Sequence, residues 1–144
     1  MVQRVAWARV SVAGEVVGSL DEPGLVVLLG VTHGDGEAEA LAMASKLGNL
    51  RILRDAEGRM NRSVAEAGGG LLVISQFTVY GDASKGRRPS FTAAAPSEVA
   101  EPLVDGVVGH LGASGARVAT GRFGADMLLE LANDGPVTLI LDVP

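Results

Sequence analysis

Two short segments place polar or conformationally unusual residues next to stretches that have the pattern of β-strands. Ser75-Gln76-Phe77-Thr78 directly follows the apolar run 71–74, and Asn133-Asp134-Gly135-Pro136-Val137-Thr138 leads into the last apolar run. A buried polar group without a hydrogen-bond partner costs about 1–3 kcal/mol. The three polar side chains of the first segment therefore need partners, which a bound ligand can supply. We predict a ligand site at residues 75–78.

A nucleophilic role for this segment is a separate possibility. In a strand, Gln76 and Thr78 would share one face and Ser75 would lie on the other. Ser75 or Thr78 could act as a nucleophile only with a base, usually a histidine, in hydrogen-bond reach. The chain has only two histidines, His33 and His110, and their spacing assembles no triad. The segment is therefore predicted to form a polar pocket without an obvious catalytic side chain.

The second segment combines a glycine and a proline. Gly135 tolerates backbone angles that other residues avoid, and Pro136 fixes its own φ and lacks an N–H. The peptide bond between them is one of the few that adopt the cis form at modest cost. Taken alone, residues 134–136 have the composition of an ordinary turn that leads into a final strand at 137–143.

The surrounding elements follow from the spacing of apolar residues. Residues 2–20 have the pattern of two strands, and the continuous apolar run 24–31 is typical of a strand buried on both faces. Short strands are also expected at 51–54 and 116–120, and a longer one at 71–80. The stretch 125–131 is compatible with either a helix or a strand.

Two helices are predicted to cover the sheet. The first starts at Asp35, and its apolar residues recur at helical spacing. The second spans about 97–111, where Pro102 should make the helix begin late or bend. We therefore expect a mixed α/β (α+β) fold, a mainly antiparallel sheet with two principal helices, in one compact domain spanning residues 1–144.

Composition limits the classes of function. The chain has 144 residues, of which 47% are hydrophobic, 20% charged and 3% aromatic, and it has no cysteine. This is the composition of a globular protein with an aliphatic core. The lack of cysteine excludes disulfides and thiolate metal sites, and no EF-hand or HExxH pattern is present, so neither a metal nor a cofactor is expected.

Charge and hydropathy bear on partners and location. No stretch approaches the roughly 20 apolar residues that span a bilayer, and the first residues lack the pattern of a signal peptide. We expect a cytoplasmic protein without membrane contacts. The net charge of −5 argues against broad adhesion to nucleic acid, although a local basic patch could bind an RNA end. Two candidate patches are Arg51, Arg54, Arg59 and Arg62, and Lys85, Arg87 and Arg88, and without other evidence we interpret both as solvated surface.

Six blocks, in order along the chain, carry a family resemblance. They are Gln3-Arg4-Val5, Asp55–Asn61, Ser75–Thr78, Arg88-Pro89-Ser90-Phe91, Thr120-Gly121-Arg122-Phe123 and Asn133–Thr138. The segments Ser75–Thr78 and Asn133–Thr138 look like the two signature motifs of the D-aminoacyl-tRNA deacylases. The resemblance implies a homodimeric enzyme that hydrolyses the ester linking a D-amino acid, and also glycine, to the 3′ end of tRNA, a chiral proofreading step in translation.

The resemblance also implies roles for single residues. Ser75, Gln76, Phe77 and Thr78 would line the pocket for the aminoacyl-adenosine end. Gly135 and Pro136 of the partner chain, joined by a cis peptide bond, would form a gate whose carbonyls exclude an L side chain. Arg4 would orient these carbonyls, and Met127 would border the adenine. The 2′-hydroxyl of the substrate would assist hydrolysis, which agrees with the lack of a positioned base.

Two alternatives stay open at this point. A non-catalytic nucleic-acid-binding accessory module with the same fold would bind through the basic patches in a salt-dependent way. A hydrolase of small esters would use Thr78 as its nucleophile and show burst kinetics.

Overall fold

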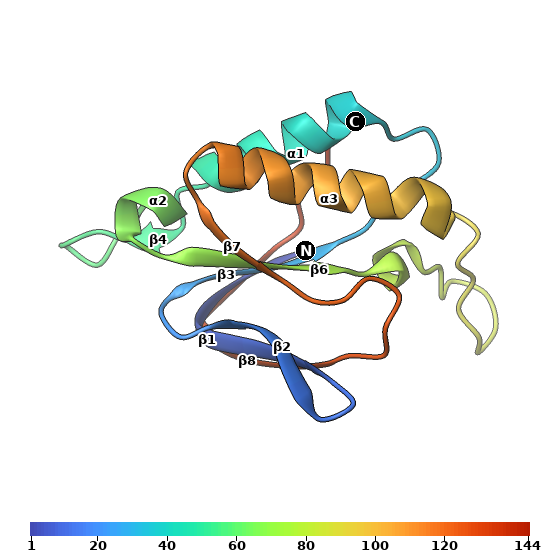
Figure 1. The fold of residues 1–144 in the computed structure, drawn as a ribbon, viewed down its shortest axis with the longest axis horizontal. Helices are drawn as coiled ribbons and strands as arrows, with labels where there is room; N and C mark the ends of the chain where they lie inside the picture. The colour runs from blue at the N-terminus through green and yellow to red at the C-terminus, as the bar shows by residue number, and fades with distance from the viewer.

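A six-stranded sheet forms the framework of the protein, whose computed structural model describes residues 1–144. The long strand β1 (Val2–Val12) pairs antiparallel with β2 (Glu15–Leu20), β3 (Gly24–Leu29) and β8 (Leu128–Leu139). The sheet continues from β3 through β6 (Gly70–Ser75) to β7 (Arg117–Thr120), and these two pairings are parallel. The predicted mixed fold with a mainly antiparallel sheet is therefore confirmed (Figure 1).

The sheet curls until β2 and β7 nearly meet. A Cβ atom on Gly18 of β2 would lie 2.2 Å from the carbonyl oxygen of Thr120 in β7, so the approach of these strands requires a glycine at this position. The curl encloses a small apolar core of seven buried residues. They are Val5, Ala8, Val10, Leu20, Val26, Leu72 and Ile74.

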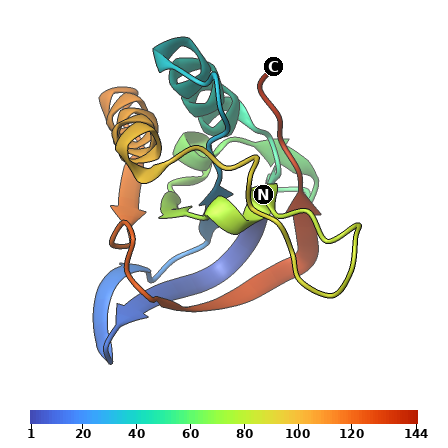
Figure 2. The same ribbon diagram turned by 90° about the vertical axis from the view of Figure 1, so that its right-hand side faces the viewer.

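Two helices, α1 (Glu37–Asn49) and α3 (Ser97–Ala113), lie side by side over one face of the sheet (Figures 1 and 2). Residues three or four apart point inward from each helix, as expected for an amphipathic helix that covers a sheet. The buried positions are Ala40, Ala44 and Leu47 in α1, and Val104, Val107 and Leu111 in α3. With the apolar side chains of β3 and β6 they form the larger core.

The start of α1 differs from the prediction, whereas that of α3 agrees with it. α1 begins at Glu37 instead of Asp35, because Gly36 caps it and its N–H donates to the Glu39 carboxylate at 2.7 Å. α3 begins at Ser97 as predicted, so of the two effects expected of Pro102, a late start or a bend, the late start does not occur. Pro102 lies on an exposed face, where the carbonyl left without its N–H partner can be hydrated.

Small elements connect α1 to β6. A hairpin of β4 (Leu53–Arg54) and β5 (Met60–Arg62) projects from one end of the molecule and is followed by α2 (Val64–Ala67) (Figure 1). This short third helix was not predicted from the sequence. It is held by a capping box in which the Ser63 hydroxyl accepts from the N–H of Glu66 at 3.3 Å, and the Glu66 carboxylate accepts from the N–H of Ser63 at 2.9 Å.

Two predicted strands end elsewhere. The strand expected over 71–80 stops at Ser75, and residues 77–80 form a 3-10 helix, η1 (Phe77–Tyr80). At the C-terminal end, the ambiguous stretch 125–131 joins β8 at Leu128, and this strand runs through the predicted turn to Leu139 instead of Val143. Pairing with β1 on both sides of the glycine and proline keeps the segment in the sheet. No helix combines the length and apolar character needed to cross a membrane.

Candidate active site

The segment Ser75–Thr78 lies where the chain leaves the sheet. Ser75 is the last residue of β6 and stands opposite Leu29 of β3. The N–H of Gln76 still donates to the carbonyl of Leu29 at 2.8 Å, and the tight turn of η1 follows. The predicted strand alternation therefore does not apply. Gln76 and Thr78 are instead brought together by η1, and the Gln76 amide donates to the Thr78 hydroxyl.

An aromatic pair joins η1 to the loop that follows it. Phe77 is 57% exposed, and its ring meets that of Phe91 edge to face, with centroids 5.2 Å apart and an interplanar angle of 72°. This geometry is the favoured one for aromatic pairs, which lets the contact hold the loop 81–95 against η1. Phe77 therefore stays more than half exposed while it makes this contact.

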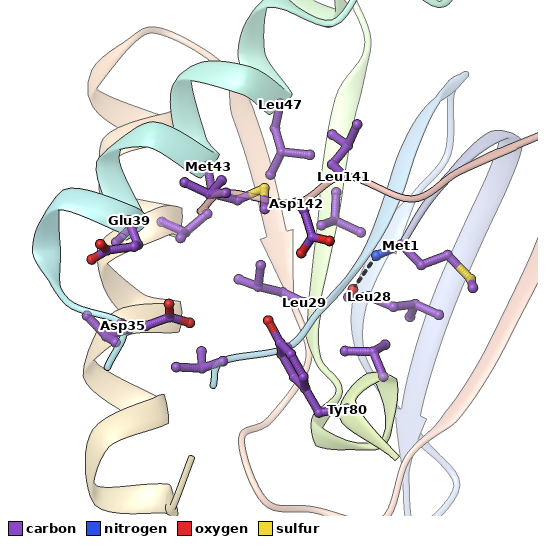
Figure 3. Close-up of a pocket in the computed structure, with 18 of the residues that line it drawn as sticks. Met1, Leu28, Leu29, Asp35, Glu39, Met43, Leu47, Tyr80, Leu141 and Asp142 are labelled. Carbon is purple, nitrogen blue, oxygen red and sulfur yellow. Dashed lines mark hydrogen bonds between the residues drawn. The ribbon is translucent and has the colours of Figure 1, made fainter. Parts of the chain in front are cut away.

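A cavity of about 460 Å³ opens beside η1, between β3, α1 and residues 140–143 (Figure 3). Thr78, Val79 and Tyr80 line one side of it, and most of its other walls are apolar. Burial raises the pKa of the Tyr80 hydroxyl above its ordinary value of 10.0, and the negative charges of Asp35 and Asp142 act in the same direction. Tyr80 therefore stays protonated at neutral pH and is not a base.

Neither histidine can activate a hydroxyl of the segment. His33 Nε2 lies 2.8 Å from the carbonyl oxygen of Thr92, and His110 Nε2 lies 3.7 Å from the carboxylate of Glu37 on α1. Neither ring lines the cavity that contains Thr78. The structure also contains no group of three His, Cys, Asp or Glu side chains arranged to hold a metal ion.

The segment Asn133–Thr138 forms an irregular loop within β8. Val5 of β1 faces Asn133 and Gln3 faces Thr138, so two steps along β1 correspond to five along β8. The Asn133 side chain spans the excess chain: its Oδ1 accepts from the N–H of Val137 at 2.8 Å, and its Nδ2 donates to the hydroxyl of Thr138 at 3.0 Å. The loop is thus a bulge pinned to the sheet and not the ordinary turn that its composition alone would indicate.

The glycine and proline lie at the centre of this bulge. The Gly135–Pro136 peptide bond is cis, as the family resemblance implied, and Gly135 has a φ of +132°. A side chain is strained at this φ, and a Cβ atom would also lie 3.0 Å from a guanidinium nitrogen of Arg4. The backbone therefore requires glycine at position 135.

Arg4 connects this bulge to the core. Its side chain is 5% exposed, and it donates from Nε to the carbonyl of Asp134 at 3.0 Å and from an Nη to the carbonyl of Ile52 at 2.9 Å. A buried guanidinium needs such partners, since an unpaired buried charge is strongly destabilising. Arg4 thus holds the peptide group directly before Gly135, and its support of a gate stays a prediction.

A second arginine, Arg54, also holds Asp134; the sequence placed it in a candidate basic patch and did not connect it to this loop. Arg54 forms a two-pronged ion pair with the Asp134 carboxylate, with N–O distances of 2.5 and 3.2 Å. This hydrogen-bonded pair, with a smaller contribution from the charge of Arg4, holds the pKa of Asp134 below its ordinary value. No local pattern could indicate the pair, because 80 positions separate its members.

Met127 lies away from the 460 Å³ cavity. Its sulfur would be 2.6 Å from a Cβ atom on Gly121, so it packs tightly over the end of β7, close to Ile74. It also borders a shallow hollow lined by residues of β1, β2 and β8. Within one chain, the structure brings Gln76 to Thr78 and Arg4 to Asp134. It does not bring Gly135 or Pro136 to the cavity that Thr78 lines.

Comparisons with known proteins agree over nearly the whole length. The profile of a family described as D-Tyr-tRNA(Tyr) deacylase matches residues 1–142. A protein of Thermobifida fusca named D-aminoacyl-tRNA deacylase is 59% identical over 143 residues, covering 99% of this chain and 98% of its own. The protein of Acidothermus cellulolyticus with the same name is also 59% identical, with 99% and 97% covered. The chain belongs to the D-Tyr-tRNA(Tyr) deacylase family.

Solved structures show the same fold. The c-Myc DNA Unwinding Element Binding Protein is 37% identical and superposes with a TM-score of 0.91, covering 99% of this chain and 97% of that one. A probable eukaryotic D-amino acid tRNA deacylase has a TM-score of 0.79 at 18% identity, over 94% and 93% of the two chains. The second likeness concerns the fold alone. The sequence-based prediction of the family is confirmed.

Proposed function

We propose that the protein hydrolyses the ester bond between a D-amino acid and the 3′ end of tRNA, releasing the free amino acid and the intact tRNA. The observation that carries this proposal is full-length identity of 55–59% to curated D-aminoacyl-tRNA deacylases. The chain also has each residue that the resemblance assigns to the site. The protein is thus a hydrolase of carboxylic esters that acts on a tRNA substrate.

Stereoselectivity is proposed to come from a gate of main-chain groups formed by Gly135 and Pro136. Arg4 and Arg54 fix the preceding residue, Asp134, and the Asn133 side chain spans the bulge. A backbone held at both ends cannot move aside for a wrongly placed side chain, so an L residue is excluded by contact. A D residue directs its side chain away from the carbonyls and is accepted.

The gate is proposed to act on the pocket of a second copy of the chain. Gly135 and Pro136 do not line the cavity that contains Thr78, which supports a homodimer in which each chain supplies the gate for its partner. Ser75, Gln76, Phe77 and Thr78 then receive the aminoacyl-adenosine end, with Met127 at the border of the adenine. The substrate 2′-hydroxyl assists ester cleavage, because neither histidine lines the cavity beside Thr78.

One deacylation assay tests the activity. Purified protein is incubated with D-Tyr-tRNA, L-Tyr-tRNA and Gly-tRNA, and the loss of ester is followed. We expect rapid hydrolysis of the D form, measurable hydrolysis of the glycyl form and almost none of the L form. Hydrolysis of the L form at a rate near that of the D form would contradict the gate. In the same assay Thr78→Ala should retain part of the activity, whereas an essential nucleophile at Thr78 would abolish it.

A non-catalytic nucleic-acid-binding function is the second candidate. The name of one structural relative, the c-Myc DNA Unwinding Element Binding Protein, favours it, since that name describes a DNA-binding protein. The deacylase relatives outweigh it because they are more similar to this chain. Salt-sensitive binding of nucleic acid without turnover of D-Tyr-tRNA would favour this second candidate.

A further inference from the structure

The basic residues of this acidic protein fall into two groups. The chain has 12 Lys and Arg residues, and most of these side chains have a hydrogen-bond or ion-pair partner within the chain. The partners are carboxylates, carbonyls or an amide, and the paired residues are Arg4, Arg9, Lys46, Arg51, Arg54, Arg59, Arg62 and Arg117. The other four have neither kind of contact. These unpaired cations are Lys85, Arg87, Arg88 and Arg122.

The unpaired cations share one end of the molecule. β3, β6 and β7 are parallel neighbours, so the segments after Leu29, Ser75 and Thr120 leave the sheet at the same edge. Arg122 follows β7 directly, and the loop 81–95 that carries the other three returns to the end of β3. In Figure 2, which faces this end, the yellow-green loop and the orange segment after β7 lie on opposite sides of η1. The segments that carry the unpaired cations thus flank η1.

The loop is held in place and its charge is not neutralised internally. Asp82 and Ser90 exchange backbone hydrogen bonds of 2.7 and 2.8 Å across it, and the Thr32 hydroxyl donates to the carbonyl of Ala93 at 2.6 Å. The one carboxylate in the loop, Asp82, accepts from the N–H of Ser84 at 2.9 Å instead of pairing with a cation. Exposed cations left free on a fixed loop of an acidic protein indicate an anionic partner.

We propose that the unpaired cations bind phosphates of the tRNA acceptor end and guide its terminal nucleotide to η1. This inference rests on the proposed function and adds the surface that recognises the tRNA beyond the aminoacyl-adenosine. A polyanion suits this arrangement, since charges on both sides of η1 can follow a continuous phosphate backbone that enters between them. The exposed ring of Phe77 lies at the point of entry, where a base can stack on it.

The test compares a substrate that has phosphates with one that has none. We would measure kcat/KM for D-Tyr-tRNA and for the D-tyrosyl ester of adenosine, in the wild type and in Lys85→Gln/Arg88→Gln. Each phosphate contact changes the logarithm of the binding constant by about 0.7 for a tenfold change in salt concentration. Two such contacts therefore strengthen binding roughly 25-fold at 0.1 M salt compared with 1 M salt. The ratio of the tRNA rate to the ester rate should fall by about that factor at 0.1 M salt, with a shallower salt dependence.

The control is Lys46→Gln/Arg117→Gln, which removes one Lys and one Arg charge from exposed positions outside the edge formed by η1 and its flanking segments. It should leave the ratio of the two rates and the salt slope at their wild-type values. Adding Arg87→Gln and Arg122→Gln to the first variant should lower the ratio further. Equal ratios and equal salt slopes in the first variant and the control would overturn the proposal.

Failure of the deacylase function would be recognised separately. In that case the wild type would hydrolyse neither substrate with stereoselectivity, whatever the variants do. In that case the docking proposal is decided by the binding of an RNA hairpin that ends in CCA and carries no amino acid. Fluorescence anisotropy measures this binding. Weaker binding in Lys85→Gln/Arg88→Gln than in the control supports the surface, and equal binding in both overturns it.

Discussion

Replacing Arg4 should affect both stability and stereoselectivity, and the two effects can be measured separately. The guanidinium is buried and donates to the carbonyls of Asp134 and Ile52. Hydrogen bonds from a charged group contribute about 1.5–3 kcal/mol each. In Arg4→Met both are lost, while the cost of burying a charge disappears, so we expect a net loss of about 3 kcal/mol in the free energy of unfolding. That corresponds to a melting temperature lower by about 10 °C for a chain of this size.

Urea unfolding at a fixed protein concentration measures the first effect, since association of two chains would otherwise add to the apparent stability. The second effect is the ratio of D-Tyr-tRNA to L-Tyr-tRNA hydrolysis, measured well below the melting temperature of the variant. Because Arg4 holds the carbonyl of Asp134 next to Gly135, this ratio should fall at least tenfold. A tenfold decrease corresponds to a loss of about 1.4 kcal/mol in the difference between the activation free energies of L and D hydrolysis. Arg4→Lys keeps the charge but has one nitrogen for two carbonyls, so it should be intermediate in both measurements.

Mixing experiments connect this variant to the proposed dimer. An Arg4→Met chain has a defective gate and an intact pocket, and a Gln76→Ala chain has the reverse. If each gate serves the partner's pocket, mixed dimers contain one site in which both parts are intact, and selective activity should return on mixing. Arg4→Met with wild-type stability and an unchanged ratio of D to L hydrolysis would refute the reasoning about the bulge, and a lack of complementation by mixing would refute the exchange of gates.

Two further predictions concern the elements that hold the site. Gly30→Ala should displace η1, because the new Cβ atom would lie 2.1 Å from Val79 and 3.0 Å from the Tyr80 ring. We expect a large loss of D-Tyr-tRNA hydrolysis with a small decrease in melting temperature. Activity equal to that of the wild type would show that η1 need not be fixed. In Asp134→Asn, the free energy of unfolding should decrease less between neutral and acid pH than in the wild type. The pKa of Asp134 is lowered in the folded protein, so its contribution to stability is complete above its unfolded pKa of about 3.9. This contribution disappears as the pH falls through the lower folded value. Urea unfolding between pH 7 and pH 3 measures this slope, and an unchanged slope in the variant would contradict the role of the Arg54 pair.

Apolar spacing was sufficient to predict most of the framework. The continuous run that became β3 and the helical spacing in α1 and α3 depend on which faces are buried, and burial leaves a direct pattern in the residues themselves. The limits of β6 and β8 were not predictable in this way. Polar residues interrupt both strands, and whether such a residue ends a strand or stays in it depends on the neighbouring strand that supplies hydrogen bonds.

The sequence alone also determined the family, because six short blocks in order identify the D-aminoacyl-tRNA deacylases, and with them the residues of the two motifs. It left open how those residues are held. Tertiary structure brought Arg54 to Asp134 across 80 positions and enclosed Arg4 between two carbonyls. It also showed that the segments carrying the four basic residues without partners flank η1. The reason is physical: ion pairing and solvent exposure depend on distances between segments that are far apart in the chain, and the pairing of β1 with β8 and the parallel order of β3, β6 and β7 set these distances.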